Sequence, residues 1–379
     1  MAIAESTPLT SLPVRRRRRT LTLTLIAIAT RAFCLLTIGV AAAHEHKTLN
    51  ALLTRFDAAY YRQIAFHGYP AHLPMVNGQV VSNPVGFFPM FPALVAVLMR
   101  MGLPFVAATL LLNTVAACVA VVLIDRVIRA TVDVEETAFL TAVMWVVQPT
   151  AFVLTLAYSE ALFTALCAGC LLALLRGRWV VAGGLALLGS ATRPSGLILA
   201  ACCLVVAVPE AIKHRKVRPL IAPVLAPLGL VAYFSYIWAR TGRIDAWFVT
   251  ERAGWHVYFD GGLDNMHRVA KYLHQGRIDG LAVVAFVVVA LVLLVLLYVD
   301  RSSPLLLVYT TGFFLLAVVT RNDLSSVPRF LLPAFPLLLP LATRLRRLST
   351  ALLTVLLTLS GLVMGLAGAF ITTRAHYPP

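Results

Sequence analysis

Long apolar stretches separated by short polar segments run through most of the chain. One of them, 281–298, carries no charged residue and approaches the ~20 residues that a helix needs to cross a lipid bilayer. Segments of alternating polar and apolar residues, which would indicate a membrane barrel, are absent from the sequence. Helices are then the remaining way to satisfy the backbone in lipid. The pattern predicts an all-α polytopic membrane protein.

The pattern predicts about 10–12 spans in a single integral membrane domain over residues 1–379. Residues 179–208 are interrupted by Thr-Arg-Pro-Ser-Gly at 192–196, which predicts two short half-depth helices that meet near the outer face. Residues 83–102 are apolar but short and rich in proline, which predicts an interfacial or re-entrant segment. The other candidate spans lie at about 21–43, 104–124, 137–157, 160–175, 217–238, 280–299, 304–320, 329–343 and 348–372.

Composition and charge agree with a membrane location. Hydrophobic residues make up 60% of the chain and charged residues 13%, whereas soluble domains carry about 25% charged residues. A net charge of +16 could indicate nucleic-acid binding. The basic residues, however, form short clusters between the apolar runs, as cytoplasmic loops do. We therefore expect a lipid bilayer, and not nucleic acid, as the partner of this charge.

The basic clusters also orient the chain. Residues 1–20 end in five consecutive arginines, and the apolar run after them is too long for a signal peptide, so we expect a basic cytoplasmic N-terminus and an uncleaved first span. Residues 44–103 then form an outer loop, expected to be catalytic and to carry interfacial helices. Residues 239–279 form a second outer loop and 321–328 a third. The expected location is the plasma membrane, with the active site on the extracytoplasmic face.

The segment 54–69 in the first outer loop has an amphipathic helical pattern. At helical spacing Asp57, Tyr61 and Ile64 share one side. Phe56, Tyr60, Gln63 and His67 share another. A helix lying on the membrane surface would place Asp57 at the boundary between lipid and water. An enzyme that acts on a lipid-linked sugar must work at this boundary.

Other unusual polar groups converge on the same face in this topology. They are Tyr158 and Glu160 at the outer join of two spans, Arg193 at the proline break, and Arg329 after the third loop. Ionisable groups at membrane depth are costly and are usually functional or paired. Together with Asp57 they offer a carboxylate base and guanidinium groups suited to a lipid phosphate.

Each of these residues also has a purely structural interpretation. Asp57 could cap an interfacial helix, and Glu160 could pair with Arg193 and serve only packing. Arg193 could instead cap the broken helix. Arg329 could be an arginine that extends to the membrane interface.

No metal site or disulfide is expected. Cys34, Cys118, Cys167, Cys170, Cys202 and Cys203 all lie inside apolar runs, as small packing residues do. Two histidines at 44 and 46 do not share a helix face, so we interpret them, with His67 and His72, as loop residues and not as metal ligands.

Three further features leave alternatives open. Arg31 inside the first span would need a carboxylate on another helix or a place near the lipid phosphate. Phe87, Phe88 and Phe91 are expected to be anchors at the lipid interface rather than a sugar platform. A group in the second outer loop either shapes the acceptor site or belongs to an amphipathic helix on the bilayer; it comprises Trp247, Glu251, Trp255 and His256.

The ordered set of motifs resembles the PIG-V-like mannosyltransferases of the GT-C superfamily, of the actinobacterial type. The family pattern Trp-Asp-x-x-Trp-Tyr followed by Ile-Ala-x-x-Gly-Tyr is similar to Arg-Phe-Asp-Ala-Ala-Tyr-Tyr at 55–61 with Ile-Ala at 64–65 and His-Gly-Tyr at 67–69. Phe56 and Tyr60 depart from the family's tryptophans, but both can still stack on a sugar. Further matches are Phe-Phe-Pro-Met-Phe-Pro at 87–92, Ala-Tyr-Ser-Glu-Ala-Leu-Phe at 157–163, Thr-Arg-Pro-Ser-Gly at 192–196 and Pro-Arg-Phe-Leu-Leu-Pro-Ala-Phe-Pro at 328–336.

The resemblance implies a GT-C helix bundle that transfers mannose from a polyprenyl-phosphate-mannose donor to a glycolipid or other cell-envelope acceptor, with inversion. Asp57 matches the family's catalytic aspartate, the general base. Arg329 and Arg193 would hold the donor phosphate, without a metal or cofactor. The implied substrate-binding residues are Phe56, Tyr60, Tyr61, His67, Tyr158 and Glu160.

Other functions remain to be compared with this one. The same fold could transfer another polyprenyl-linked sugar, such as arabinose or glucose. A lipid-carrier transporter would be expected to have charges near the bilayer midplane and repeated halves, whereas the polar motifs here cluster at one face and no repeat is evident. A catalytically inert partner subunit would have no need of Asp57.

Overall fold

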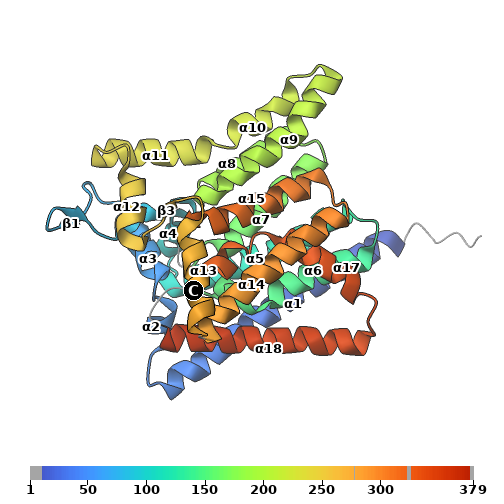
Figure 1. Ribbon diagram of the computed structural model, residues 1–379, viewed down its shortest axis with the longest axis horizontal. Coiled ribbons are helices and arrows are strands. Elements are labelled where there is room, and N and C mark those ends of the chain that lie inside the picture. Colours follow the sequence, from blue (N-terminus) through green and yellow to red (C-terminus); the bar gives the residue numbers. More distant parts are fainter. Residues whose placement is uncertain (1–10, 277, 322–325, 376–379) are drawn as a thin grey trace, which may run out of the picture.

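The computed structural model describes residues 11–276, 278–321 and 326–375. The regular secondary structure of this part of the chain is helical apart from two short antiparallel ribbons (Figure 1). Strand β1 (Met75–Val76) pairs with β2 (Gln79–Val80), with Met75 opposite Val80. Strand β3 (Tyr258–Phe259) pairs with β4 (Thr320–Arg321) and so joins the segment 239–279 to the end of a distant helix.

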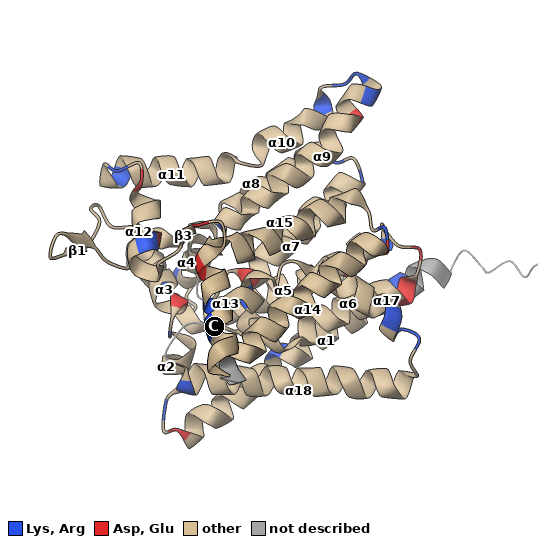
Figure 2. Ribbon diagram, in the orientation of Figure 1, with Lys and Arg blue, Asp and Glu red and all other residues tan. Residues whose placement is uncertain are grey.

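The long helices confirm the polytopic all-α architecture. Within the described residues six helices are long and apolar enough to cross a membrane, or seven if a bent pair forms one span. Charged residues lie mainly at helix ends and in the connections, and the middles of the long helices carry few (Figure 2). These helices are α1 (Ser11–His44), α5 (Phe105–Arg129), α9 (Leu197–His214), α10 (Ile221–Leu225) continued by α11 (Leu228–Thr241), α14 (Ile278–Val299) and α18 (Thr350–Arg374).

Shorter apolar helices fill the rest of the bundle. At about 1.5 Å per residue, a helix of 12–16 residues is shorter than the ~30 Å hydrocarbon layer. The remaining helices of the bundle are α7 (Glu160–Leu175), α8 (Trp179–Ser190), α15 (Pro304–Val319), α16 (Val327–Phe330) and α17 (Leu339–Leu345), with the 3₁₀ turns η3 (Pro194–Gly196), η4 (Arg218–Leu220) and η6 (Phe335–Leu338).

The break at 192–196 is present, with a difference from the expectation. Helix α8 has 12 residues, but α9 and its preceding turn, Pro194–His214, have 21 and meet the length for a full span. Only the first of the two helices is therefore short. The chain still reverses direction at η3, and the basic connection after α9 lies at the end of the bundle away from α3 (Figure 1).

A bend in the apolar stretch predicted at 137–157 supplies hydrogen-bond partners for Arg31. Helix α6 (Glu135–Val147) and the 3₁₀ helix η2 (Pro149–Thr155) meet at 69°, because the proline at the start of η2 cannot continue the α-helical hydrogen bonds. Arg31, which is buried, donates to the carbonyls of Val146 at 3.2 Å and Ala151. Among the described residues its partners are thus polar groups around the bend and the Met364 sulfur, so the interpretation that a carboxylate there pairs with Arg31 was wrong. A place near a lipid phosphate stays a prediction.

The loop elements gather at one end of the bundle (Figure 1). Two phenylalanines that we expected at the lipid interface pack inside this end: Phe88 lies against Tyr233 and Phe91 against Tyr61, and both are buried. The interpretation of these two as lipid anchors was wrong. The elements are α2 (Leu49–Leu53), α3 (Asp57–His67), η1 (Pro84–Gly86), α4 (Met90–Arg100), α12 (Ala246–Trp255) and α13 (Leu263–Gln275).

Candidate active site

Asp57 is the first residue of α3, where a carboxylate faces the positive end of the helix dipole. Its preceding residue Phe56 has φ 57° and ψ −132°, a backbone conformation that costs a residue with a Cβ about 1–3 kcal/mol. Arg55 holds this turn, because its guanidinium lies 4.6 Å from the Phe56 ring centre and donates to the Thr372 and Ala375 carbonyls at the end of α18. The turn thus directs Asp57 inward, and the residue is only 8% exposed.

Arg329 joins Asp57 to a second carboxylate. Its Nη1 donates to Asp57 Oδ2 at 2.6 Å, and its Nε lies 3.6 Å from Glu160 Oε1. The guanidinium also lies 4.9 Å from the centre of the Tyr158 ring. The Nε atom is buried and donates no hydrogen bond within the described chain. Arg329 therefore has a donor to spare at the centre of the cluster.

Glu160 begins α7 and is completely buried. Its Oε1 accepts a hydrogen bond from Arg193 Nη1 at 2.5 Å, while its Oε2 has no partner in the described part of the chain. The Arg193 side chain makes no capping hydrogen bond to η3, so the structure shows the ion pair and not the cap. Asp57, Glu160, Arg193 and Arg329 together form what we call the charged cluster.

Two tyrosines of α3 extend the site beside Asp57. Tyr61 is buried and donates from its hydroxyl to Ser159 Oγ at 3.2 Å, and burial raises the pKa of this phenol above its ordinary value. Tyr60 is half-buried and stacks on Phe87, with 4.9 Å between the ring centres. Tyr158 is buried, and its hydroxyl has no partner among the residues described.

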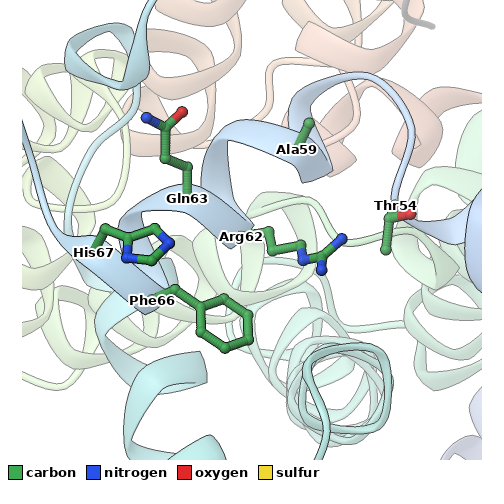
Figure 3. Close-up of a pocket in the computed structure, with 6 residues that line it drawn as sticks. All are labelled: Thr54, Ala59, Arg62, Gln63, Phe66 and His67. Carbon is green, nitrogen blue, oxygen red and sulfur yellow. The ribbon is translucent and has the colours of Figure 1, made fainter.

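His67 lies apart from these groups. It lines a shallow hollow of about 470 Å³ on the outward side of α3, together with Thr54, Ala59, Arg62, Gln63 and Phe66 (Figure 3). Asp57 lies on the buried side of the same helix. The structure therefore brings Asp57, Tyr60, Tyr61, Tyr158, Glu160, Arg193 and Arg329 to one region and leaves His67 on another surface.

Glu251 is a site residue that the sequence left without a clear role. It reaches the site from α12, and burial together with the negative charge of Asp57 raises its pKa to about 8. A usable signal was present, because Glu251 precedes Trp255 by one helical turn in a segment that also carries Trp247 and Phe248. Among the described residues, the site included, no three His, Cys, Asp or Glu side chains come together as a group of metal ligands.

Comparison with known proteins places the chain in a family. The model of the family described as "Mannosyltransferase (PIG-V)" matches residues 22–220, more than half of the chain. The fold is similar to that of ArnT from Cupriavidus metallidurans, solved bound to undecaprenyl phosphate, with a TM-score of 0.53 and 14% identity over 97% of this chain and 77% of that one. The oligosaccharyltransferase of Archaeoglobus fulgidus gives a TM-score of 0.45 and 11% identity over 85% of this chain and 51% of that one. No curated protein matches the chain at a significant level.

The family match and the fold lead to the same assignment. The matched residues include the turn that carries Asp57, both ends of the Glu160–Arg193 pair, and the break at η3. The likeness to ArnT adds the GT-C arrangement of the membrane helices. The chain belongs to the PIG-V mannosyltransferase family and is an integral, multi-pass membrane glycosyltransferase with the GT-C fold.

Proposed function

We propose that the protein transfers mannose from polyprenyl-phosphate mannose to a glycolipid or another cell-envelope acceptor at the extracytoplasmic face, with inversion of the anomeric centre. The observation that carries the proposal is the inward-facing Asp57 carboxylate in contact with Arg329. A lipid-linked donor is supported by the family and by the undecaprenyl phosphate in the structure of ArnT. The basic clusters between the spans support an outer location for the site.

The proposed reaction is a single displacement. The acceptor hydroxyl oxygen forms a bond to the anomeric carbon as the bond from that carbon to the donor phosphate oxygen breaks. Asp57 takes the hydroxyl proton, and the electron pair of the broken bond stays on the phosphate oxygen, which leaves as polyprenyl phosphate. The charge that develops on the phosphate is offset by the guanidinium groups of Arg329 and Arg193.

The ion pairs of the charged cluster are compatible with these roles. A guanidinium has five N–H donors, and Arg329 uses one on Asp57 while its Nε donates to no other group in the described residues. Arg329 can therefore bind a phosphate oxygen without first releasing Asp57. Two carboxylates face two guanidinium groups here, so the anionic donor enters a cluster whose own charges balance.

A transfer assay tests the donor. Purified protein in lipid nanodiscs is incubated with polyprenyl-phosphate [³H]mannose and a membrane lipid extract, and we expect label in a new glycolipid or glycan. The control donors are GDP-mannose, polyprenyl-phosphate arabinose and polyprenyl-phosphate glucose. We expect little or no sugar transfer from any of them. If the protein transfers arabinose or glucose faster than mannose, the preferred sugar takes the place of mannose in the proposal. If it transfers no lipid-linked sugar, the proposed function is overturned.

The orientation of the site is tested by cysteine labelling. Val76 on β1 and Val217 beyond α9 are 58% and 81% exposed, and five of the six native cysteines are buried. In intact cells we expect a membrane-impermeant maleimide to label Val76→Cys. Val217→Cys should react only after the membrane is permeabilised. Labelling of both from one side would contradict the topology, and the reverse pattern would place the site in the cytosol.

A further inference from the structure

Helix α12 of the second outer loop closes an aromatic surface beside α3. The Trp255 ring lies 5.3 Å from Tyr60 and 5.2 Å from Phe87, centre to centre. Tyr61 adds an edge contact to Phe87 at 5.0 Å. We call Tyr60, Tyr61, Phe87 and Trp255 the aromatic cluster. Because two of its members follow Asp57 on α3 within about one helical turn, the cluster adjoins the proposed base.

The backbone under the aromatic cluster is held by hydrogen bonds from three other aromatic side chains. The Tyr69 hydroxyl donates to the Phe87 carbonyl at 2.6 Å, and the Tyr233 hydroxyl donates to the Val85 carbonyl at 2.6 Å. The indole of Trp247 donates to the Gly86 carbonyl at 3.3 Å. A surface fixed in this way can bind a ligand without first losing much conformational freedom.

Glu251 lies at the edge of this surface, and a glycine makes room for it. A Cβ on Gly86 would lie 2.8 Å from Trp255 Cζ3 and 3.0 Å from Glu251 Oε1. Both side chains therefore rest against the backbone of η1. Within the described residues the Glu251 carboxyl group takes part in no hydrogen bond or ion pair, although Asp57 acts on it electrostatically. Glu251 is thus a polar group without a partner in the described part of the chain, at the edge of an aromatic surface and within the electrostatic influence of the proposed base.

We propose that Glu251 and Trp255, with Tyr60, bind a sugar ring of the acceptor and hold one of its hydroxyl groups at Asp57. The inference rests on the proposed function and specifies its acceptor. Aromatic rings offer a flat apolar face to the C–H groups of a sugar, and a carboxyl group can bind the hydroxyl groups at the edge of that sugar. Aromatic rings with a few convergent polar groups are typical of ligand sites.

The position of Glu251 favours the acceptor over the donor. The donor phosphate is assigned to Arg329 and Arg193, which are largely buried and pair with Asp57 and Glu160. Asp57, which takes the acceptor's proton, is the charged group that most strongly raises the Glu251 pKa. The substrate hydroxyl at Asp57 and the ring on Trp255 therefore belong to one molecule. The acceptor class is then a molecule that ends in a sugar, and not a plain lipid alcohol.

Kinetics with matched acceptors test this inference. The probes are n-octyl glycosides of mannose and glucose, and n-octanol as the alcohol without a sugar. The wild-type protein should transfer mannose to at least one octyl glycoside and not to octanol. In Glu251→Ala and Trp255→Ala the KM for the glycoside should rise about tenfold, with the KM for polyprenyl-phosphate mannose unchanged. Glu136→Ala and Trp238→Ala, which alter exposed residues outside the site, should leave both KM values unchanged.

Conservative variants distinguish binding from misfolding. Trp255→Phe keeps an aromatic ring and should recover part of the glycoside affinity lost in Trp255→Ala. An unchanged acceptor KM in both alanine variants, a rise in donor KM instead, or equal transfer to octanol and octyl glycoside would each overturn the inference. If the wild-type protein transfers nothing from polyprenyl-phosphate mannose to its own membrane extract, the proposed function fails, whereas the outcomes above leave that transfer intact.

The pH dependence of acceptor binding gives an independent test. The raised pKa of Glu251 means that its carboxyl group is protonated below about pH 8 and ionised above it. The ionised form loses its donor and adds a negative charge beside Asp57. The glycoside KM should therefore rise as the pH increases through about 8, and remain level in Glu251→Gln, whose amide resembles the protonated carboxyl. The wild-type protein and Glu251→Gln share the groups that face residue 251, which are Asp57, Arg193, Arg329 and Tyr233. The inference is therefore contradicted if the glycoside KM depends on pH in the same way in both proteins.

Discussion

Replacing Asp57 by asparagine should lower the kcat for mannose transfer by about 10²–10⁴-fold, because an amide cannot take the proton of the acceptor hydroxyl. The side chain keeps its size, and its amide oxygen can still accept from Arg329, which donates to Asp57 at 2.6 Å in the native protein. The fold and the affinity for the donor should therefore change little. Single-turnover transfer of labelled mannose, with bound polyprenyl-phosphate mannose measured separately, checks the two expectations.

The matched control is Asp133→Asn, which makes the same chemical change at an exposed position in the connection between α5 and α6. It should transfer mannose at the wild-type rate. Asp57→Glu should retain more activity than Asp57→Asn, since the longer side chain keeps a base but moves it by about one methylene group. Turnover near the wild-type rate in Asp57→Asn would remove Asp57 from the role of base, whatever the folding of the variant.

Much of the fold could be predicted because bilayer constraints act locally on the sequence. Each apolar run must satisfy its own backbone, so uncharged segments such as α14 are recognisable one at a time. The same holds for the break at Pro194, since proline ends helices by its own chemistry. That Asp57, Tyr61 and Ile64 share one side of α3 also follows from the period of 3.6 residues, although the burial of that side does not.

Contacts between distant segments could not be predicted in the same way. Asp57 and Arg329 are separated by 272 positions, and no local pattern states that they pair. Arg31 appeared to need an ionic partner, whereas it is largely satisfied by backbone carbonyls that a bend in another helix releases. Phe88 is of the residue type that anchors helices at the lipid interface, but in the structure its ring packs against Tyr233 of α11. In each case the deciding group comes from an element far along the chain.

Glu251 illustrates the same limit at the site itself. The sequence left two places open for this carboxylate, the acceptor site or an amphipathic helix on the bilayer, and its spacing from Trp255 could not decide between them. Its position depends on η1, where the absence of a side chain at Gly86 lets α12 approach. The segment 239–279 is in turn held to the end of α15 by the β3–β4 ribbon and by Asn265, which donates to the Val318 carbonyl at 2.9 Å. Three loop segments must be in place before the carboxyl group reaches the site.

The second large effect is expected at Arg329. Arg329→Gln should lower kcat/KM for the donor by about 10²–10³-fold, since it removes the guanidinium group proposed to offset the phosphate charge. Arg329→Lys keeps the charge but not the planar group of five donors, so it should recover only part of the loss. Donor affinity, measured with labelled polyprenyl phosphate, should fall in both variants. Arg346→Gln, at an exposed position after α17, should bind and turn over the donor normally.

The ion pair makes it possible to separate the catalytic role of Arg329 from its structural one. Arg329 and Asp57 side chains are 9% and 11% exposed, so Arg329→Gln leaves a buried carboxylate without its partner and should destabilise the protein by about 3–5 kcal/mol. Adding Asp57→Asn removes that charge and should restore much of the stability. Donor affinity should stay low in the double variant, because the phosphate still lacks its guanidinium. Recovery of both stability and donor affinity would instead show that Arg329 serves only to neutralise Asp57.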